Sequence, residues 1–494
     1  MNKAASAAFP RATTRRINPA WMLILGASSS LLISVCMWQL FFDDSLARSW
    51  PLQVSSALIA WGLIYVITTR KQFGTVYLFG SAYLLSLIVF HLSQVMYHGF
   101  GLEHFRHYVS GTQAIWIEKA SWASLLAVAC LGIGTALSPQ RRRKLSSVQT
   151  ERYERDFSKT LAAAYWIGLG LLAAAVFGLA LTLITVGNIF AYTRLEFFAG
   201  VGDTRGFSLF LLAAPSSAIM MVVGAKTRAT RFLAYVTAAI IVVLLLLLGY
   251  RSSALFAGLV GAVVWVKVGR KIPLPVAVVA VLIVVLVIPA VRVLRDLGTL
   301  QDISQEKVTQ AFETTRSSEV ILEIGGTNGI LANVMRWVDQ GERFWLGQSY
   351  YWALTEFVPN FTLTMERRGE SLDGARETLK TLREDNPARW YTYKVNRWKF
   401  DHGQGHGFST VAEPYLNFGY PGIFVYFIGM GFLLGRLDQV DLRTHPKTLI
   451  FSGALLWPLI KSVRNSFGVF IKPLSLMLIV ILAWRLFTFW KHHR

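Results

Sequence analysis

The stretch FLAYVTAAIIVVLLLLLG, residues 232–249, holds no charged residue and is close to the length of about 20 residues that a helix needs to cross a bilayer. Lipid offers no partner to a free peptide group, so such a segment is expected to be helical. Of the 494 residues 54% are hydrophobic and 16% charged, against about 25% charged in soluble domains. This composition excludes a soluble globular enzyme and predicts an all-α polytopic membrane protein.

Hydropathy predicts about twelve transmembrane helices along the chain. Their expected spans are 21–41, 52–69, 73–97, 122–137, 161–186, 207–224, 232–249, 254–268, 274–294, 415–434, 448–459 and 470–490. Residues 1–291 are expected to hold nine of these helices, residues 292–412 to form one large periplasmic loop domain, and residues 413–494 to hold the last three helices. A connection as long as 292–412 is usually functional.

The net charge of +21 is typical either of a nucleic-acid-binding protein or of a membrane protein with a marked topological bias. Its basic excess lies in segments that the predicted helices place on one side: the N-terminal arm, 70–71, 141–159, 226–231, 267–271, 436–447 and the C-terminal tail. Nucleic-acid binding would need this charge on one folded module. The positive-inside rule therefore predicts that both termini are cytoplasmic, with the first span kept as an anchor, and that nucleic acid is not a partner. Cys36 and Cys130 lie in apolar segments and are expected to be buried free thiols.

The chain has no Walker A, HExxH or CxxC motif, so neither a metal nor another cofactor is expected. Its most informative stretch is WKFDHGQGHGFSTVAEPYLNFGYPG, residues 398–422, which runs into the predicted tenth helix and carries His402, His406 and Glu413 to the outer membrane boundary. An imidazole or a carboxylate at that depth is suited to act as a general base toward a sugar hydroxyl. In the alternative interpretation, the glycines shape the start of a helix and Glu413 caps it.

Arginines at the outer ends of predicted helices form a second candidate group. Arg251 interrupts an apolar run between the seventh and eighth helices, Arg292 and Arg295 end the ninth, and Arg464 lies between the last two. Guanidinium groups bind phosphate oxygens in a bidentate manner, so a converging set predicts a pyrophosphate site. Arginines that only extend to lipid headgroups are the alternative.

Aromatic and basic residues alternate in the long loop, and flat apolar faces beside hydrogen-bond donors suit sugar rings. The candidate glycan-binding residues are Arg336, Trp337, Arg343, Tyr350, Trp398, Tyr415 and Asn417. A belt at the membrane interface would have the same composition. Helical patterning is expected at 330–337 and 350–358 within this loop.

Four motifs carry a resemblance to a known family: GYRSS at 249–253, LGQSY at 346–350 followed by FVP at 357–359, HGFSTVAEPYLNFG at 406–419, and RNSF at 464–467. They resemble the Wzy-type O-antigen polymerases, which join the oligosaccharide repeat units of bacterial surface polysaccharides. The resemblance covers the second half of the chain well and the first half by hydropathy.

The resemblance implies a GT-C-like, metal-independent glycosyltransferase at the periplasmic face of the bacterial inner membrane. Undecaprenyl-pyrophosphate-linked oligosaccharide would be both donor and acceptor, and a chain-length regulator and a flippase would be partners in lipopolysaccharide biosynthesis. It also implies that Arg251, and less directly Arg292, Arg295 and Arg464, hold the pyrophosphate.

Two other functions remain open at this point. An O-antigen ligase would use the same donor but transfer the glycan to a lipid A core. A flippase or transporter of lipid-linked oligosaccharide would carry charged residues along the middle of several helices, whereas here the intramembrane charges are expected at the outer ends.

Overall fold

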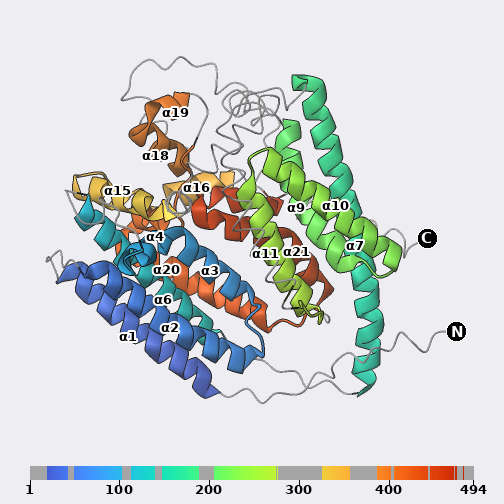
Figure 1. Cartoon of the computed structure of the whole chain (residues 1–494), viewed down its shortest axis with the longest axis horizontal. Coiled ribbons are helices and arrows are strands. Elements are labelled where there is room, and N and C mark those ends of the chain that lie inside the picture. Colours follow the sequence, from blue (N-terminus) through green and yellow to red (C-terminus); the bar gives the residue numbers. More distant parts are fainter. Residues whose placement is uncertain are drawn as a thin grey trace.

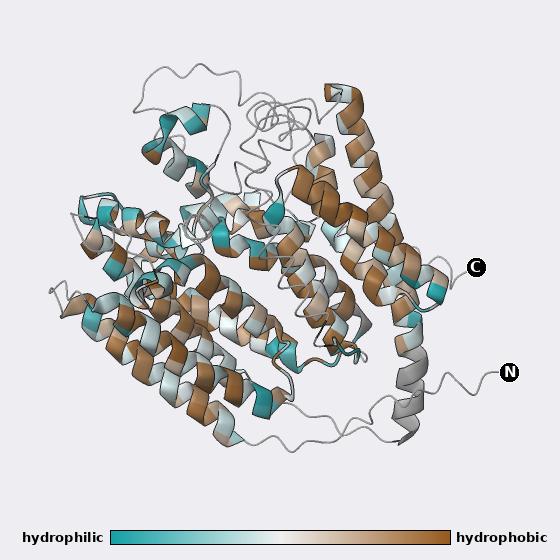
Figure 2. Ribbon diagram, in the orientation of Figure 1, coloured by the Kyte–Doolittle hydropathy of each residue, from teal (hydrophilic) through white to brown (hydrophobic). Residues whose placement is uncertain are grey.

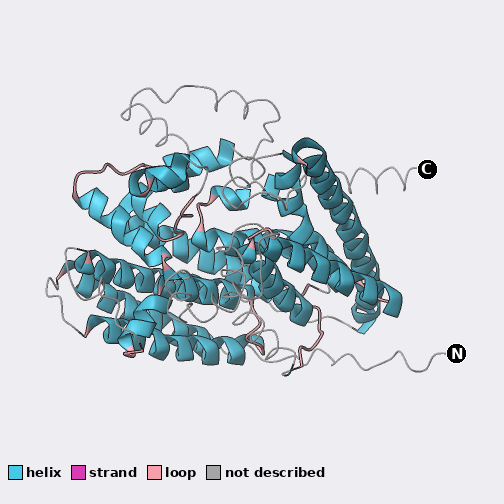
Figure 3. Ribbon diagram, turned by 45° about the horizontal axis from the view of Figure 1, so that its top comes forward, coloured by secondary structure: helices cyan, strands magenta, loops and turns pink. Residues whose placement is uncertain are grey.

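The computed structural model describes residues 19–42, 49–102, 113–138, 147–187, 205–273, 325–355, 386–401, 405–442, 445–471 and 473–475, together with 275 and 482. For residues 147–156, 205, 446 and 447 the backbone alone is described. Within these ranges the regular structure is entirely helical (Figures 1 and 3). The helices are α1 (Pro19–Phe41), α2 (Trp50–Phe73), α3 (Phe79–His91), α4 (Ser93–Gly99), α6 (Ala114–Leu137), α7 (Ser147–Val186), α9 (Arg205–Gly224), α10 (Arg228–Leu247), α11 (Arg251–Lys267), α15 (Thr327–Asp339), α16 (Gln348–Thr355), α18 (Pro387–Val395), α19 (Arg397–Asp401), α20 (Ala412–Gln439), α21 (Pro446–Lys461) and the short helix η4 (Ser462–Arg464).

Among the described residues, seven helical segments are long and apolar enough to cross a membrane, and they belong to α1, α2, α6, α7, α9, α10 and α20. The segment predicted at 73–97 contains a bent pair, α3 and α4, whose axes differ by 61° and which would make an eighth span. The segments predicted at 254–268 and 448–459 correspond to α11 and α21, helices of 17 and 16 residues. The spans predicted at 274–294 and 470–490 lie almost wholly outside the described residues. The all-helical, polytopic membrane class is therefore confirmed, and the number twelve stays a prediction.

The first bundle is built around α6, which packs against α1 and α20. Small residues make this close approach possible, since a Cβ at Gly431 of α20 would overlap the carbonyl of Leu131 in α6. Helices in lipid gain their association mainly from such close packing. Cys36 of α1 and Cys130 of α6 are buried here as free thiols, as predicted.

The second bundle consists of α7, α9, α10, α11 and α21 (Figure 1). Gly178 and Gly206 bring α7 and α9 so close that a Cβ on either would lie 2.5 Å from the other's carbonyl oxygen. The indole of Trp457 in α21 donates to the hydroxyl of Ser216 in α9 at 2.9 Å. These contacts fix α21 against α9, and with it the turn that follows α21.

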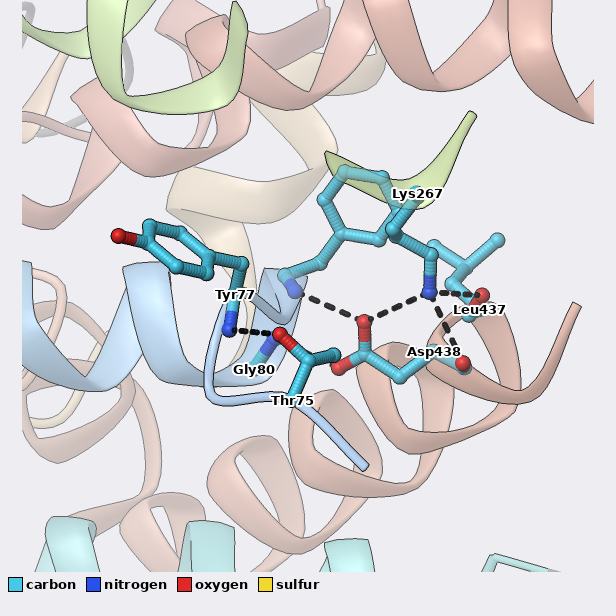
Figure 4. Close-up of polar contacts among 7 residues, drawn as sticks. Thr75, Tyr77, Gly80, Lys267, Leu437 and Asp438 are labelled. Carbon is cyan, nitrogen blue, oxygen red and sulfur yellow. Dashed lines mark hydrogen bonds and ion pairs between the residues drawn. The ribbon is translucent and has the colours of Figure 1, made fainter. Parts of the chain in front are cut away.

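A buried ion pair joins the two bundles (Figure 4). The carboxylate of Asp438, near the end of α20, accepts the first two backbone N–H groups of α3, from Phe79 at 2.8 Å and Gly80 at 2.9 Å. Lys267, the last residue of α11, donates to the same carboxylate at 3.2 Å and to the Asp438 carbonyl at 2.8 Å. Because the N–H groups of a first helical turn have no partner within their helix, Asp438 caps α3 while it pairs with Lys267.

Four shorter helices, α15, α16, α18 and α19, lie together beyond one end of the bundles (Figure 1) and are more hydrophilic than the spans (Figure 2). The helix predicted at 330–337 is confirmed as α15, and α16 covers part of the one predicted at 350–358. The amide of Asn328 donates to Ser121 of α6 at 2.9 Å, which seats α15 on the first bundle.

Candidate functional site

The segment before α20 pairs with the turn that follows α21. The backbone N–H of Phe408 donates to the carbonyl of Arg464 at 3.1 Å, and that of Thr410 donates to Val463 at 3.2 Å. Gly407 has a φ of 76° and lies so close to this turn that a Cβ would be 2.8 Å from the Arg464 carbonyl oxygen. Glycine is required there both by conformation and by space. The pairing joins the motif at 406–419 to the one at 464–467.

Glu413 is the buried carboxylate of this junction, with 2% of its surface exposed. Its Oε2 accepts the backbone N–H of Phe467 at 2.7 Å. Its Oε1 is buried and makes no close hydrogen bond, although the Ser349 hydroxyl lies near enough to interact with the carboxylate. The start of α20 is instead capped by Ser409, whose Oγ accepts from Val411 at 3.2 Å and from Ala412 at 3.0 Å. The described contacts therefore give the capping role to Ser409 and leave one carboxylate oxygen of Glu413 available.

His91, at the end of α3, is a residue that sequence reasoning missed. Its Nε2 lies 2.8 Å from the Oγ of Ser409, and its Nδ1 lies 3.2 Å from the carbonyl of Leu87. Since the carbonyl only accepts, Nδ1 carries the proton and Nε2 accepts from Ser409. The only available signal was a histidine within an apolar run. His91 therefore fixes the serine that caps the helix of Glu413.

Asn417 fixes the LGQSY motif to the first turns of α20. Its Oδ1 accepts from Gly347 at 2.9 Å, while its Nδ2 donates to Ser349 at 2.8 Å and to the Glu413 carbonyl at 2.8 Å. The backbone of Leu346 also donates to the Asn417 carbonyl at 3.1 Å. Leu346 and Gly347 both have positive φ, 48° and 93°, so these bonds stabilise a tight and partly strained turn. The amide of Asn417 is fully engaged within the protein.

The helix α20 breaks at Gly419, where φ is 66° and ψ is −151°. This conformation is essentially restricted to glycine. Pro421, two residues later, lacks the N–H that would continue the helix. Non-helical backbone at membrane depth is tolerated where it is buried in protein or lines a water-filled cavity. The break separates the short segment that carries Glu413 from the long spanning part of α20.

Three tyrosines, Tyr83, Tyr350 and Tyr426, lie near Glu413. The ring of Tyr350 stacks on Tyr426 at 6.4 Å and meets Phe467 edge-on at 5.7 Å. Its hydroxyl is buried without a hydrogen-bond partner, and the pKa of Tyr350 is raised well above its usual range by burial and then by the nearby charge of Glu413. Thr410 connects the hydroxyls of Tyr83 (3.2 Å) and Tyr426 (3.3 Å). Tyr350, predicted to bind glycan, is thus a neighbour of the carboxylate.

His406 lies before this junction, between α18 and α20. Its backbone N–H donates to the Thr392 hydroxyl at 3.1 Å, and its ring meets Tyr391 edge-on at 6.2 Å. Its Nε2 is buried without a partner. Burial, and secondly the charge of Lys399, lower the pKa of His406, so the neutral imidazole with a free proton-accepting nitrogen is favoured. His402 lies outside the described residues.

Lys461, the last residue of α21, is a second residue that sequence reasoning missed. Its Nζ donates to the hydroxyl of Ser253 at 2.9 Å, and among the described residues no carboxylate lies within ion-pair distance of it. Ser253 is two residues after Arg251 in α11, and Lys461 is three residues before Arg464. The contact therefore joins the GYRSS motif to the turn that carries Arg464.

Arg464 itself lies over the ring of Phe90, 5.7 Å from its centroid, and Phe90 packs against Phe256 of α11 at 5.6 Å. Arg251 and Arg464 are thus carried by elements in direct contact. Arg292 and Arg295, the other two predicted pyrophosphate ligands, lie outside the described residues.

The other glycan-binding candidates have different surroundings. Trp337 packs on Trp390, with centroids 5.3 Å apart, and the Nε of Arg336 is buried without a partner. Arg343 is exposed, as is Trp398, which exposes 53% of its surface. Tyr415 is buried between Phe344 and Tyr420, so its ring serves packing.

No group of three or more His, Cys, Asp or Glu residues in the described part of the chain is arranged to hold a metal ion. The prediction that catalysis needs no metal stays a prediction, since His402 and much of the long loop are outside the described ranges.

Comparison with known proteins identifies one family. The model of the O-antigen polysaccharide polymerase Wzy family matches residues 25–492, nearly the whole chain. No curated protein and no solved structure matches the chain.

Proposed function

Because the chain belongs to the Wzy family of O-antigen polysaccharide polymerases and therefore polymerises O-antigen repeat units, we propose that the reaction takes place at the junction of α20 with the turn after α21. The observation that carries this proposal is the buried carboxylate of Glu413. One of its oxygens is held by Phe467, and the other makes no close hydrogen bond, with the Ser349 hydroxyl near the carboxylate. A carboxylate that is fixed on one side and open on the other is suited to accept a proton.

The proposed donor and acceptor are both undecaprenyl-pyrophosphate-linked oligosaccharides. Glu413 takes the proton of the terminal hydroxyl of the acceptor unit, and that oxygen forms a bond to the anomeric carbon of the donor chain. The bond between this carbon and the pyrophosphate oxygen breaks, and its electron pair leaves with the pyrophosphate. His406, with a free and buried Nε2, is the second candidate base, and His402 is the third.

The leaving pyrophosphate gains negative charge in this step, and fixed cations stabilise such charge best where water is excluded. Arg251 and Arg464 are proposed to bind it, together with Lys461, whose contact with Ser253 brings their elements together. Arg292 and Arg295 are proposed as further ligands on sequence grounds. Since the energy resides in the donor's own phosphate ester bond, neither nucleotide nor metal is proposed.

The acceptor glycan is proposed to lie over the helices beyond the bundle ends, along Arg336, Trp337, Arg343 and Trp398, and to reach Glu413 past Tyr350. Tyr415 and Asn417 would act indirectly, through the packing and the turn that hold Tyr350 in place. We further propose a GT-C-like arrangement in the bacterial inner membrane. This end would face the periplasm, both termini would be cytoplasmic, and a flippase and a chain-length regulator would be partners.

Polymer synthesis by the purified chain in proteoliposomes, from a lipid-linked repeat unit, tests the role of Glu413. Glu413→Gln keeps a carbonyl oxygen for the Phe467 N–H but removes the base, so the rate should fall by about 10²- to 10⁴-fold while folding is retained. Asp401→Asn, at an exposed ion pair on α19, is the matched control and should leave the rate unchanged. Full-length polymer made by Glu413→Gln at the rate of the control would refute the assigned role.

Cells that lack the protein separate polymerase from ligase activity. Loss of a polymerase leaves lipid A core capped with a single repeat unit, whereas loss of a ligase leaves long polymer on the carrier lipid. The first pattern is expected.

A further inference from the structure

A fixed guanidinium lies at the end of α11 opposite to Arg251. Arg270 donates from its two terminal nitrogens to the carbonyls of Val222 and Ala225, each at 3.2 Å, and so satisfies the last turn of α9. Its Cζ lies 4.3 Å from the ring centroid of Trp265, whose Nε1 donates to the carbonyl of Lys271 at 3.3 Å. The cation is thus held on a flat aromatic face instead of moving freely at the surface.

A second arginine, Arg231, lies near Arg270 at the start of α10. Tyr235 of α10 packs against Trp265, with ring centroids 6.5 Å apart, and Arg231 lies one helical turn before Tyr235 on the same face. The pKa of Arg270 is lowered by burial and then by the like charge of Arg231, as expected for neighbouring cations. In the part of the chain that the structure describes, neither arginine has an acidic partner. Two like charges held together favour an anion between them.

The surface next to this pair is apolar and open. Of the seven candidate spans α10 is the least buried, at 17%. Val242 (38% exposed) lies on the same face as Arg231 and Tyr235, and Phe232 (72%) and Val243 (52%) lie about a third of a turn round the helix from Arg231. The first turn of α10 has no need of an external anion, because Thr227 and Thr230 form a reciprocal capping box. The anion site therefore depends on the side chains of Arg231 and Arg270, directly beside a helix face that lipid would cover.

We propose that Arg231 and Arg270 bind the headgroup of an anionic phospholipid, with its phosphate between the two guanidiniums and its acyl chains along α10. Trp265 and Tyr235 contact the glycerol region, since aromatic rings prefer that depth. The exposed guanidinium of Arg231 is suited to this ligand because its planar fork matches phosphate oxygens, while Arg270, whose terminal nitrogens already donate to two carbonyls, adds fixed positive charge. The site is separated from the proposed polymerisation site by the length of α11, 17 residues, or about 25 Å. It does not depend on the proposed catalytic residues.

Native mass spectrometry of the full chain in detergent, titrated with phosphatidylglycerol or phosphatidylcholine, tests the proposal. The wild type should retain phosphatidylglycerol in preference to phosphatidylcholine. Arg231→Gln should weaken phosphatidylglycerol binding about fivefold, the effect of about one cationic side chain near a lipid surface. The matched control is Arg70→Gln, an exposed arginine in the last turn of α2 that removes the same charge, and it should leave binding unchanged.

Three results would overturn the proposal. Equal losses in Arg231→Gln and Arg70→Gln would show diffuse electrostatic attraction without a site. Equal retention of the two lipids by the wild type would show that the negative headgroup is not recognised. Complete displacement of phosphatidylglycerol by inorganic phosphate would show a site for free anions, with no part played by α10. Because none of these measurements uses polymer synthesis, they are independent of whether Glu413 is the base.

Discussion

The ion pair of Asp438 and Lys267 allows a stability prediction whose size follows from its contacts. The two side chains expose 3% and 7% of their surfaces, and Asp438 accepts two backbone N–H groups in addition to Lys267. In Asp438→Asn, an amide NH₂ group replaces one of the two carboxylate oxygens. The backbone N–H of α3 that donated to that oxygen would then point at another donor. One charge-assisted hydrogen bond is lost, and Lys267 stays buried without a negative partner. Removal of one partner from a buried pair typically costs about 3–5 kcal/mol, and we expect that range.

Lys267→Met should be milder. Lys267→Met removes the Lys267 hydrogen bonds to the Asp438 carboxylate and to the carbonyls of Leu437 and Asp438. Asp438 would still accept the N–H groups of Phe79 and Gly80 at the positive end of the α3 dipole, so we expect a smaller loss, of about 1.5–3 kcal/mol. In the double variant no buried cation is left unpaired. Its destabilisation should therefore be smaller than the sum of the two single variants, with a coupling of about 0.5–3 kcal/mol.

The two cysteines provide the assay, because Cys36 and Cys130 are the only thiols and both are buried in the first bundle. Labelling by a thiol-reactive dye along a denaturant series reports the opening of that bundle. Asp401→Asn is the control, since its pair with Arg397 is exposed to solvent and should contribute little to stability. A Lys267→Met variant that is destabilised as much as Asp438→Asn, or a double variant equal to the sum, would refute the view that Asp438 both caps α3 and compensates Lys267.

Three further predictions concern the site. Gly419→Ala should destabilise the protein by about 1–3 kcal/mol in the same thiol assay, because only glycine readily adopts the backbone conformation at this position. A denaturant midpoint equal to that of the wild type would contradict a strained break in α20. Lys461→Met should lower kcat/KM for the lipid-linked donor by about 10²-fold if its ammonium stabilises the leaving group, with the exposed Lys271→Met as control; a loss below about twofold would remove Lys461 from the site. For His406, whose pKa is lowered in the folded protein, the unfolded chain takes up the proton first as the pH falls below about 6.5. Wild type should therefore lose stability relative to His406→Gln between about pH 7.5 and 5.5, and a difference that is constant with pH would contradict the buried, neutral imidazole.

Part of the site was predictable from local pattern. The stretch 398–422 indicated Glu413 and His406 because ionisable residues at the start of an apolar helix are unusual. The same reasoning selected Asn417 and Tyr415 for sugar binding, but their polar or aromatic groups are engaged inside the protein, with Ser349 and with Phe344. Composition indicates which side chains are able to bind a sugar, whereas only packing shows which ones are already occupied.

His91 and Lys461 show why the rest was not predictable. His91 meets Ser409 across 318 residues of sequence, and Lys461 meets Ser253 across 208. Neither position belongs to a motif, and each acquires its meaning from a helix that arrives from elsewhere in the chain.

Local sequence pattern was sufficient to predict a helical membrane protein, because hydropathy and peptide hydrogen bonding act within each segment. Its motifs also indicated the polymerase family, which the match over residues 25–492 establishes. The packing of the helices was needed to show that Glu413 is held by Phe467 while Ser409 caps the helix, that Lys461 joins the elements of Arg251 and Arg464, and that Asp438 links the two bundles. The physical reason is that these are single contacts between distant segments. Their partners are set by how the helices pack and break, which no local periodicity encodes.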